Sequence, residues 1–563
     1  MHLYFLEVDI ERYKYMSNVK TMIIDYKENI PATIESLIPA EYKYHFFRAE
    51  VDGRLRELAY TVNKPCKIEL FPLNGDSEAM LIYRNSLMYL LCKAIHNVHP
   101  GLKIKVNHSI SRSLYVTPLD PNQAINQNEL RQISLELNRI IQADFPIKRH
   151  SLTISKAKEY YVKLDMKDKL DILRYRNEEP VHLYECDDYF DYFYSYMVPS
   201  SGYIKQFNLI WFTPGFLVQY PRHDFEGQIP PFEPETVYAR TLEATKVWAR
   251  KVNLSTIPQI NDYANNYGNV DFVMMCESHI SNQLSELGNQ IISSQSPIKL
   301  ICIAGPSSSG KTTFANRLRL ELLSKGLNPI RISCDDYYKE KKDMTPLPDG
   351  SYDLETIDAI DVKLFNEQMA KLADGQEVTL PKFNFSLGKR EEGRKLQLKP
   401  GEPLIVEGIH ALNEVMTSSI NSSNKFKIFI APQAQINIDN HSPISVTDIR
   451  LLRRIVRDSK FRGSSAEDTI KMWPSVRRGE FNWIYSTQEQ ADYVFNSLLP
   501  YELCVMKKYA YPLLAKIEKN SDTYVTCRRL MLFLKYFSDI DESVVPNNSL
   551  MREFIGGSCF KDV

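Results

Sequence analysis

The chain contains 563 residues, which predicts three to four domains at about 150 residues each. Hydrophobic residues make up 44% and charged residues 25%, so the chain can form packed cores and is not disordered as a whole. Lys and Arg total 69 against 70 for Asp and Glu. The resulting net charge of -1 argues against a protein that coats nucleic acid, although it leaves a local basic groove open.

The sequence favours a soluble protein in a reducing compartment. No apolar run approaches the ~18 residues of a membrane span, and the first residues turn acidic too early for a signal peptide. The nine cysteines are scattered singly, without a Cys-x-x-Cys pair, as is typical of small core residues in the cytosol. We therefore expect a cytoplasmic protein that does not contact a membrane.

Residues 1–75 predict a small mixed domain. Short strands are expected at 3–8, 20–24, 46–51 and 67–71. An Asp52-Gly53 pair predicts a turn after the third of these strands.

Three further segments follow in chain order. Residues 76–225 predict a mixed α/β segment that includes a helix at 83–98. Residues 226–295 begin with a proline-rich stretch and then predict a helical connector. From 296 to 563, strands and helices alternate as in a parallel α/β domain.

The strongest signal is a stretch that fits the pattern G-x-x-x-x-G-K-[ST]. It consists of Gly305, Pro306, Ser307, Ser308, Ser309, Gly310, Lys311 and Thr312. The glycines let the backbone curl around a phosphate with its N–H groups pointing inward. Lys311 adds a positive charge at the β- and γ-phosphates, and the Thr312 hydroxyl is placed to bind Mg²⁺. An apolar run at 298–303 precedes the stretch and a helical pattern at 314–322 follows it, which together predict ATP or GTP binding.

Two acidic residues follow predicted strands beyond this loop. The strand at 329–334 ends at Asp335, and the strand at 404–406 ends at Glu407. Because ligands gather at the carboxyl ends of parallel strands, we expect Asp335 near the γ-phosphate, where it accepts the proton of an attacking hydroxyl or orients it. The alternative for Asp335 is a helix N-cap or a contact to Mg²⁺-bound water. Glu407 is predicted to belong to the magnesium site with Thr312.

A run of arginines lies near residue 450. Arg450, Arg453, Arg454 and Arg457 are spaced i, i+3, i+4, i+7, which places their guanidinium groups on one helix face. Planar guanidinium forks stabilise charge on a transferring phosphoryl group. A solvated basic helix is the usual explanation of such a run. After a phosphate-binding loop, a lid over the nucleotide is the favoured interpretation.

Residues 298 to about 515 resemble the uridine kinase/phosphoribulokinase family of P-loop kinases. The matching elements occur in family order at Gly305–Thr313, 335–338, 352–353, 380–385, 406–409 and 453–458. The resemblance implies that Asp335 is the catalytic base and that Asp353 holds the ribose hydroxyls of the acceptor. It also implies that Tyr338 and Phe383 belong to the acceptor site, that Thr313 belongs to the nucleotide loop, and that Arg450, Arg453 and Arg457 are lid arginines.

The chain departs from this family at the acceptor site. In uridine–cytidine kinases a Tyr and, five residues later, a His contact the pyrimidine, whereas Phe383 and Gly388 occupy those positions here. Phe383 can still stack on a base, but we find no replacement for the hydrogen bond of the missing His. A site that loses a buried polar reader loses discrimination, so the preferred base stays open.

The first half resembles parts of threonyl-tRNA synthetases. Residues 46–71 are similar to their small β-grasp (TGS) domain and residues 80–222 to their second additional domain. The combination resembles bacterial nucleoside kinases, usually labelled uridine kinases, that carry this extension. The four metal-type positions of the synthetase module, His-x3-His and Cys-x3-His, are Asn85, Tyr89, Phe193 and Met197 here. None is a ligand suited to zinc, so we expect no metal at these positions and no inherited hydrolysis of aminoacyl-tRNA.

The aromatic stretch at 189–196 has two interpretations. It is either a packed strand of core and edge residues, which we favour, or a base-stacking platform like those of single-strand binders.

The sequence thus predicts an α/β protein with a C-terminal P-loop kinase domain, preceded by a β-grasp domain and an α+β synthetase-like domain. We expect phosphorylation of a nucleoside 5′-hydroxyl by ATP with Mg²⁺, and family analogy suggests self-association. One alternative is a kinase for another small-molecule hydroxyl, such as a sugar phosphate or pantothenate. The other is an RNA-binding regulator, in which the synthetase-like half recognises tRNA and the nucleotide site is a switch.

Overall fold

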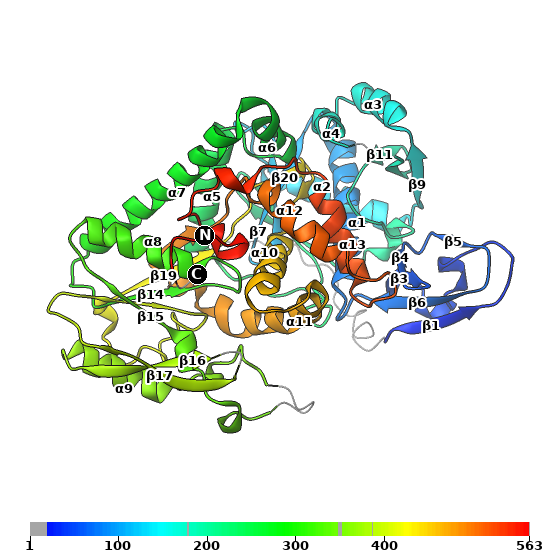
Figure 1. The fold of residues 1–563 in the computed structure, drawn as a ribbon. Helices are drawn as coiled ribbons and strands as arrows, with labels where there is room; N and C mark the ends of the chain where they lie inside the picture. The colour runs from blue at the N-terminus through cyan, green and yellow to red at the C-terminus, as the bar shows by residue number, and fades with distance from the viewer. Residues whose placement is uncertain (1–19, 177–178, 347–351, 385–386, 562–563) are drawn as a thin grey trace.

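The computed structural model of the protein describes residues 20–176, 179–346, 352–384 and 387–561 (Figure 1). It is a mixed α/β protein with antiparallel sheets in the N-terminal region and a parallel sheet in the C-terminal region. Within the described ranges no helix is both long and apolar enough to cross a membrane. The strand expected at residues 3–8 lies outside these ranges.

An antiparallel sheet with the order β1-β6-β3-β4 forms the first unit. Its strands are β1 (Met22–Tyr26), β3 (Phe46–Val51), β4 (Arg54–Arg56) and β6 (Cys66–Pro72). Ile68 and Leu70 of β6 point into the core while their neighbours stay more exposed, which is the alternation that predicted this strand. Asp52 and Gly53 have φ of 48° and 72°, so this pair makes the tight turn between β3 and β4 as expected. A short pair, β2 (Ala32–Thr33) and β5 (Thr61–Val62), completes the unit.

The next unit is built around a long buried helix, α1 (Ser77–Val98). This helix begins six residues before the predicted start, because the Asp76 carboxylate accepts the Ala79 N–H and caps it. Two antiparallel sheets accompany it, with the orders β12-β13-β8-β7 and β11-β10-β9. Their strands are β7 (Ile104–Ile110), β8 (Ser113–Pro118), β9 (Ile147–Leu152), β10 (Val181–Cys186), β11 (Tyr189–Asp191), β12 (Asn208–Phe212) and β13 (Gly215–Gln219). The other helices are α2 (Gln127–Gln142), α3 (Ile154–Lys163) and α4 (Lys167–Leu173).

Two rings of the aromatic stretch at 189–196 are buried in the core. Tyr192 and Phe193 are 9% and 2% exposed. The Phe193 ring packs edge-on against Tyr89 of α1, with ring centroids 5.9 Å apart. Only Tyr189–Asp191 of the stretch is a strand, and the two buried rings that follow it are not available to stack on bases.

The expected connector is helical, with α5 (Thr236–Lys251), α6 (Ile257–Asp262) and α7 (Asn269–Ile292). In α7, Glu277 forms a buried ion pair with Arg317 at 2.9 Å. The connector is therefore packed onto the C-terminal region and is not a free linker (Figure 1).

The C-terminal region contains a five-stranded parallel sheet with the order β15-β18-β14-β19-β22. Its strands are β14 (Leu300–Ala304), β15 (Ile330–Ser333), β18 (Leu404–Glu407), β19 (Lys425–Ala431) and β22 (Tyr493–Asn496). Two hairpins extend it, β16 (Val378–Asn384) with β17 (Lys389–Leu396), and β20 (Asn437–Asp439) with β21 (Ser442–Pro443). Its helices are α8 (Lys311–Ser324), α9 (Val362–Ala373), α10 (Val446–Phe461), α11 (Ala466–Gly479), α12 (Glu502–Leu514), α13 (Tyr524–Leu534) and α14 (Arg552–Ile555). The expected α/β class is confirmed.

The β20–β21 hairpin and α13 join this region to the N-terminal sheets. The Val106 N–H on β7 donates to the Asn440 carbonyl oxygen at 2.8 Å. Arg529 on α13 donates to Glu78 on α1 at 2.7 Å and also pairs with Asp448 at the start of α10. The two halves are thus linked through the same segment that leads into the arginine-bearing helix.

Candidate active site

The glycine-rich stretch forms a loop between β14 and α8, as predicted. A Cβ at Gly305 would lie 1.9 Å from the Ile430 carbonyl oxygen on β19, so only glycine fits where the loop leaves the sheet. Ser308 and Gly310 have φ of 59° and 89°, and this left-handed backbone turns the chain into α8. Lys311 begins that helix and donates to the Gly305 and Pro306 carbonyl oxygens at 2.9 and 3.1 Å.

Several hydroxyls of this loop are left without partners. The side-chain oxygens of Ser308, Ser309 and Thr313 are buried and make no hydrogen bond to any described residue. Buried polar groups are normally satisfied, so these atoms indicate that the loop is shaped for a polar ligand. The N-terminus of α8 adds a partial positive charge there, which favours a phosphate.

The sheet order brings both predicted carboxylates to this loop. Glu407 ends β18, which lies between β14 and β15 and pairs with Ile303 and with Ser333. Asp335 follows β15 in a short 3-10 turn, and its backbone N–H donates to the Ser333 hydroxyl at 3.3 Å. Asp335 and Glu407 therefore meet at the same edge of the sheet as Lys311.

The charges of these groups shift one another's pKa values. Burial raises the pKa of Glu407 to about 7, with a further rise from Asp335 and an opposing effect from Arg331. Burial also raises the pKa of Asp335, while Lys311, Arg462 and Arg457 lower it. Burial lowers the pKa of Lys311, opposed by both carboxylates. A carboxylate whose pKa is raised is a stronger base, which suits the role expected of Asp335.

The oxygen groups at this edge fit a hard divalent cation. The Thr312 side chain opens α8 beside Lys311, and Glu407 and Asp335 supply carboxylates. Hydroxyl, carboxylate and phosphate oxygens are the ligands that Mg²⁺ prefers. These residues therefore could hold Mg²⁺ with a bound nucleotide, although the ligand role of each stays a prediction.

The arginine run forms one face of α10, as its spacing predicted, but two of its members are deeply buried. Arg450 and Arg453 are each 1% exposed and form ion pairs with Glu480 and Glu502. Arg450 also donates to the Ser307 carbonyl oxygen at 3.0 Å, so this side chain stabilises the backbone of the loop. This arrangement differs from a mobile lid, and a role of either residue in transfer stays a prediction.

The other arginines of this face lie closer to the phosphate side. Arg454 donates to the Ser307 hydroxyl at 2.8 Å and pairs with Asp458. Arg457 also pairs with Asp458, at 2.8 Å, and its charge acts on both Asp335 and Lys311. Arg462, just past the end of α10, acts on Asp335 in the same way. A role of these guanidinium groups at a γ-phosphate stays a prediction.

Three carboxylates that contact the loop or its neighbouring arginines were not predicted from the sequence. Glu480 accepts the Ser307 N–H at 3.2 Å, and Glu553 in the C-terminal helix α14 accepts the Thr313 N–H at 2.9 Å. Glu502 neutralises Arg453. Glu553 lies 240 residues from its partner, so no local pattern could have indicated the contact.

The expected acceptor residues gather near Asp335. The Tyr338 hydroxyl donates to the Leu354 carbonyl oxygen at 2.9 Å, and its ring lies 5.6 Å from that of Phe383. The Asp353 carboxylate accepts the Glu355 N–H at 3.0 Å. Gly388, with φ of 62°, lies in the turn after β16, so its position offers no side chain to read a base.

One buried histidine near this site was not singled out from the sequence. His410 is 1% exposed, and burial lowers its pKa to about 4, which keeps the imidazole neutral. The charge of Asp353 acts on it. Its position three residues after Glu407 was the available signal.

A phosphate-binding loop between a parallel strand and a helix, faced by carboxylates from two neighbouring strands, defines a P-loop phosphotransferase. Comparison with known proteins makes the class more specific. The profile of the Phosphoribulokinase / Uridine kinase family matches residues 300–502. The chain belongs to this family and carries a kinase domain for a small-molecule hydroxyl.

The relatives of this domain are bacterial uridine kinases. The chain is 31% identical to that of Borrelia duttonii over 206 residues, which cover 35% of this chain and 85% of the relative. It is also 31% identical to that of Staphylococcus aureus strain JH9 over 197 residues, or 35% of this chain and 86% of the relative. A solved structure of a possible uridine kinase from Bacillus stearothermophilus aligns with a TM-score of 0.29 and 17% identity, covering 39% of this chain and 100% of that one.

A different relative supports the synthetase-like character of the N-terminal part. The chain is 29% identical to a threonine–tRNA ligase of Desulforamulus reducens over 162 residues. The match covers 29% of this chain and only 25% of the ligase. The likeness therefore concerns a part of that enzyme.

Proposed function

We propose that this protein transfers the γ-phosphoryl group of ATP to the 5′-hydroxyl of a nucleoside. The observation that carries the proposal is the meeting of Asp335, Glu407 and Lys311 at the carboxyl edge of the parallel sheet. The Tyr338 and Phe383 rings beside Asp353 support a ribose-bearing acceptor with a flat base.

Each step of transfer can be assigned to a side chain. Asp335 accepts the proton of the acceptor hydroxyl as its oxygen bonds to the γ-phosphorus and the bond to the β-phosphate oxygen breaks. Lys311 leaves its two loop carbonyls and follows the charge onto the β- and γ-phosphate oxygens. Arg457 and Arg462 face the same region and stabilise the charge on the transferring group. Mg²⁺ bound with the nucleotide neutralises phosphate charge.

The test is the variant Asp335→Asn. This variant keeps the shape of the side chain but cannot accept the proton, so we expect nucleoside-dependent ADP release to fall by about 10²-fold or more, the usual range for a general base. ATP affinity, measured by calorimetry, should change little. Asp374→Asn, an exposed residue at the end of α9, is the matched control. Normal turnover by Asp335→Asn with a verified nucleoside acceptor would contradict the proposal.

The choice of base, the use of GTP, self-association and RNA contact through the N-terminal region remain predictions. The burial of the Tyr192 and Phe193 rings takes these two rings out of any stacking surface for RNA. A kinase for a different hydroxyl is distinguished by the acceptor pocket, because a sugar phosphate or pantothenate has no aromatic base to stack on Phe383.

A further inference from the structure

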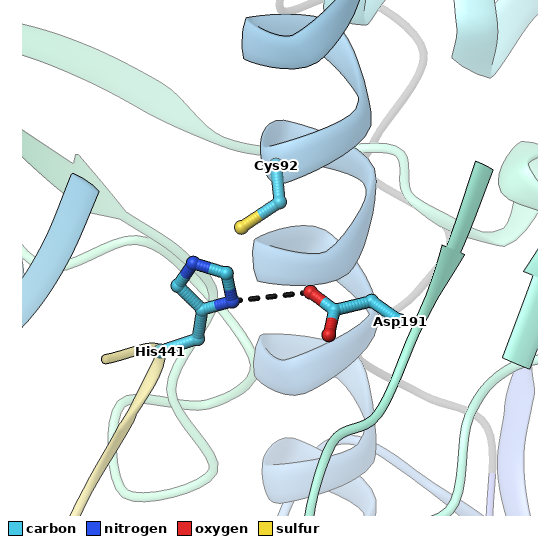
Figure 2. Close-up of side chains that lie close together, drawn as sticks. All are labelled: Cys92, Asp191 and His441. Atoms are coloured by element: carbon cyan, nitrogen blue, oxygen red, sulfur yellow. Dashed lines mark hydrogen bonds and ion pairs between the residues drawn. The ribbon is translucent and has the colours of Figure 1, made fainter. Parts of the chain in front are cut away.

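Three side chains at the junction of the two halves form a cluster that no part of the kinase site uses. Cys92 comes from the buried face of α1, Asp191 ends β11, and His441 lies in the turn between β20 and β21 (Figure 2). One ligand atom from each, namely a sulfur, a carboxylate oxygen and an imidazole nitrogen, lies within 4.8 Å of the other two. The cluster therefore combines two residues of the N-terminal region with one of the C-terminal region.

The carboxylate at its centre is held firmly. Asp191 is fully buried, and one of its oxygens accepts the Tyr192 N–H at 2.7 Å and lies 3.4 Å from the Lys169 ammonium. Its other oxygen accepts the Tyr189 hydroxyl at 3.1 Å and lies 3.1 Å from His441 Nδ1. Outer contacts of this kind orient a metal ligand before the metal arrives.

The imidazole is held in a similar way. The Phe193 ring stacks on His441, with centroids 5.8 Å apart and planes 21° apart. The His441 N–H of the backbone donates to the Asp439 carboxylate at 3.0 Å, which shapes the turn. Figure 2 shows the imidazole facing both the Cys92 sulfur and the Asp191 carboxylate.

A buried lysine and the imidazole share the carboxylates of this junction. Lys169 is buried between Asp191 and Asp439, at 3.4 and 2.5 Å, so one ammonium faces two carboxylates. A divalent cation bound here would add positive charge beside Asp191 and take over the pairing that His441 Nδ1 now makes with this carboxylate at 3.1 Å.

We propose that Cys92, Asp191 and His441 bind Zn²⁺ or a similar divalent transition metal. Sulfur, nitrogen and oxygen ligands together suit zinc, whereas Mg²⁺ and Ca²⁺ prefer oxygen alone. The ion takes the place of the hydrogen between His441 Nδ1 and Asp191, while Lys169 stays on the far carboxylate oxygen. With bonds of about 2.0–2.3 Å, the ligand atoms of tetrahedral zinc lie about 3.3–3.7 Å apart, so His441 Nδ1 and the Asp191 oxygen, at 3.1 Å, are already near enough and any approach falls to the Cys92 sulfur, with water as a fourth ligand.

This site is distinct from the metal-type positions of the synthetase module. None of its ligands is one of those four positions, which are Asn85, Tyr89, Phe193 and Met197 here. Cys92 lies about one turn of α1 beyond Tyr89, and His441 comes from a part of the chain with no counterpart in that comparison. Because α10 begins at Val446, metal at His441 would tie the N-terminal region to the hairpin that leads into the arginine helix.

The test uses the full chain, stripped of metal and titrated with Zn²⁺ against a chromogenic chelator. We expect one tightly bound ion per chain and an affinity at least about tenfold weaker in Cys92→Ser and in His441→Gln. Cys559→Ser, which removes an exposed thiol, is the matched control and should bind as the unmodified chain does. Replacement of Zn²⁺ by Co²⁺ should give a thiolate-to-metal absorption band that is absent in Cys92→Ser.

A second measurement needs no variant and so is independent of folding defects. The unmodified protein is treated with iodoacetamide with and without Zn²⁺, and the labelled peptides are identified by mass spectrometry. Zn²⁺ should slow the labelling of Cys92 at least tenfold and leave that of Cys559 unchanged. Equal labelling of Cys92 in both conditions, or no saturable Zn²⁺ binding, would overturn the proposal and leave a thiol hydrogen-bonded to His441.

Discussion

The contact between Glu553 and the phosphate-binding loop predicts an unusual gain of function. The Thr313 N–H belongs to the first turn of α8, the part of a helix that binds anions such as phosphate, and it donates to the Glu553 carboxylate at 2.9 Å. Leu550 of the same segment packs 3.9 Å from the position that a Cβ on Gly310 would take. The C-terminal segment therefore places a negative charge where the nucleotide brings several more.

The magnitude follows from this one contact. A hydrogen bond to a charged group contributes about 1.5–3 kcal/mol, and Glu553 is only half-buried, so the lower end of that range applies. In Glu553→Gln the side chain keeps its size but loses the charge that opposes phosphate. We expect ATP to bind about tenfold more tightly, since 1.4 kcal/mol corresponds to a factor of ten.

The assay is calorimetric titration of ATP into the two proteins at low salt. Glu518→Gln, an exposed glutamate before α13, is the control and should leave the affinity unchanged. Added salt should narrow the difference between Glu553→Gln and the unmodified chain, because screening weakens exposed charges first. Equal or weaker ATP binding by Glu553→Gln would refute the reasoning.

Three further predictions concern the same site. Arg453→Met removes the charged partner of the buried Glu502, which still accepts the Leu499 N–H, and should lower the free energy of unfolding in urea by about 3–5 kcal/mol; an unchanged value would show that the pair is not needed. Gly305→Ala forces a Cβ to within 1.9 Å of the Ile430 carbonyl oxygen, so calorimetry should show ATP binding lost while circular dichroism still shows a folded chain. The folded-state pKa of Glu407 is raised to about 7, so in Mg²⁺-free buffer its protonation stabilises the fold at low pH, and that stability is lost as pH rises from about 4.5 through 7. Glu407→Gln should flatten this decline in melting temperature, and a parallel decline would contradict it.

The core of the candidate site could be read from the sequence because its signals are local. A β-branched apolar run, a glycine-rich loop and a helical repeat follow one another within about 25 residues, and the structure places β14, the loop and α8 there. Asp335 and Glu407 could be placed because parallel strands end at a common edge.

The supports of the site could not be read in this way. Helical spacing put Arg450 and Arg453 on one face, but their burial depends on Glu480 and Glu502, which lie 30 and 49 residues further on. The spacing of the arginines is the same whether they form buried ion pairs that support the loop or a lid that covers the nucleotide. The start of α1 was missed because Asp76 was not recognised as its N-cap.

The most direct test of the account is a panel of nucleosides and other small alcohols, screened for ADP release with ATP and Mg²⁺. We expect at least one ribonucleoside to be converted to its 5′-monophosphate, identified by mass spectrometry and phosphorus NMR. Turnover of a sugar phosphate or pantothenate, with no nucleoside phosphorylated, would contradict it.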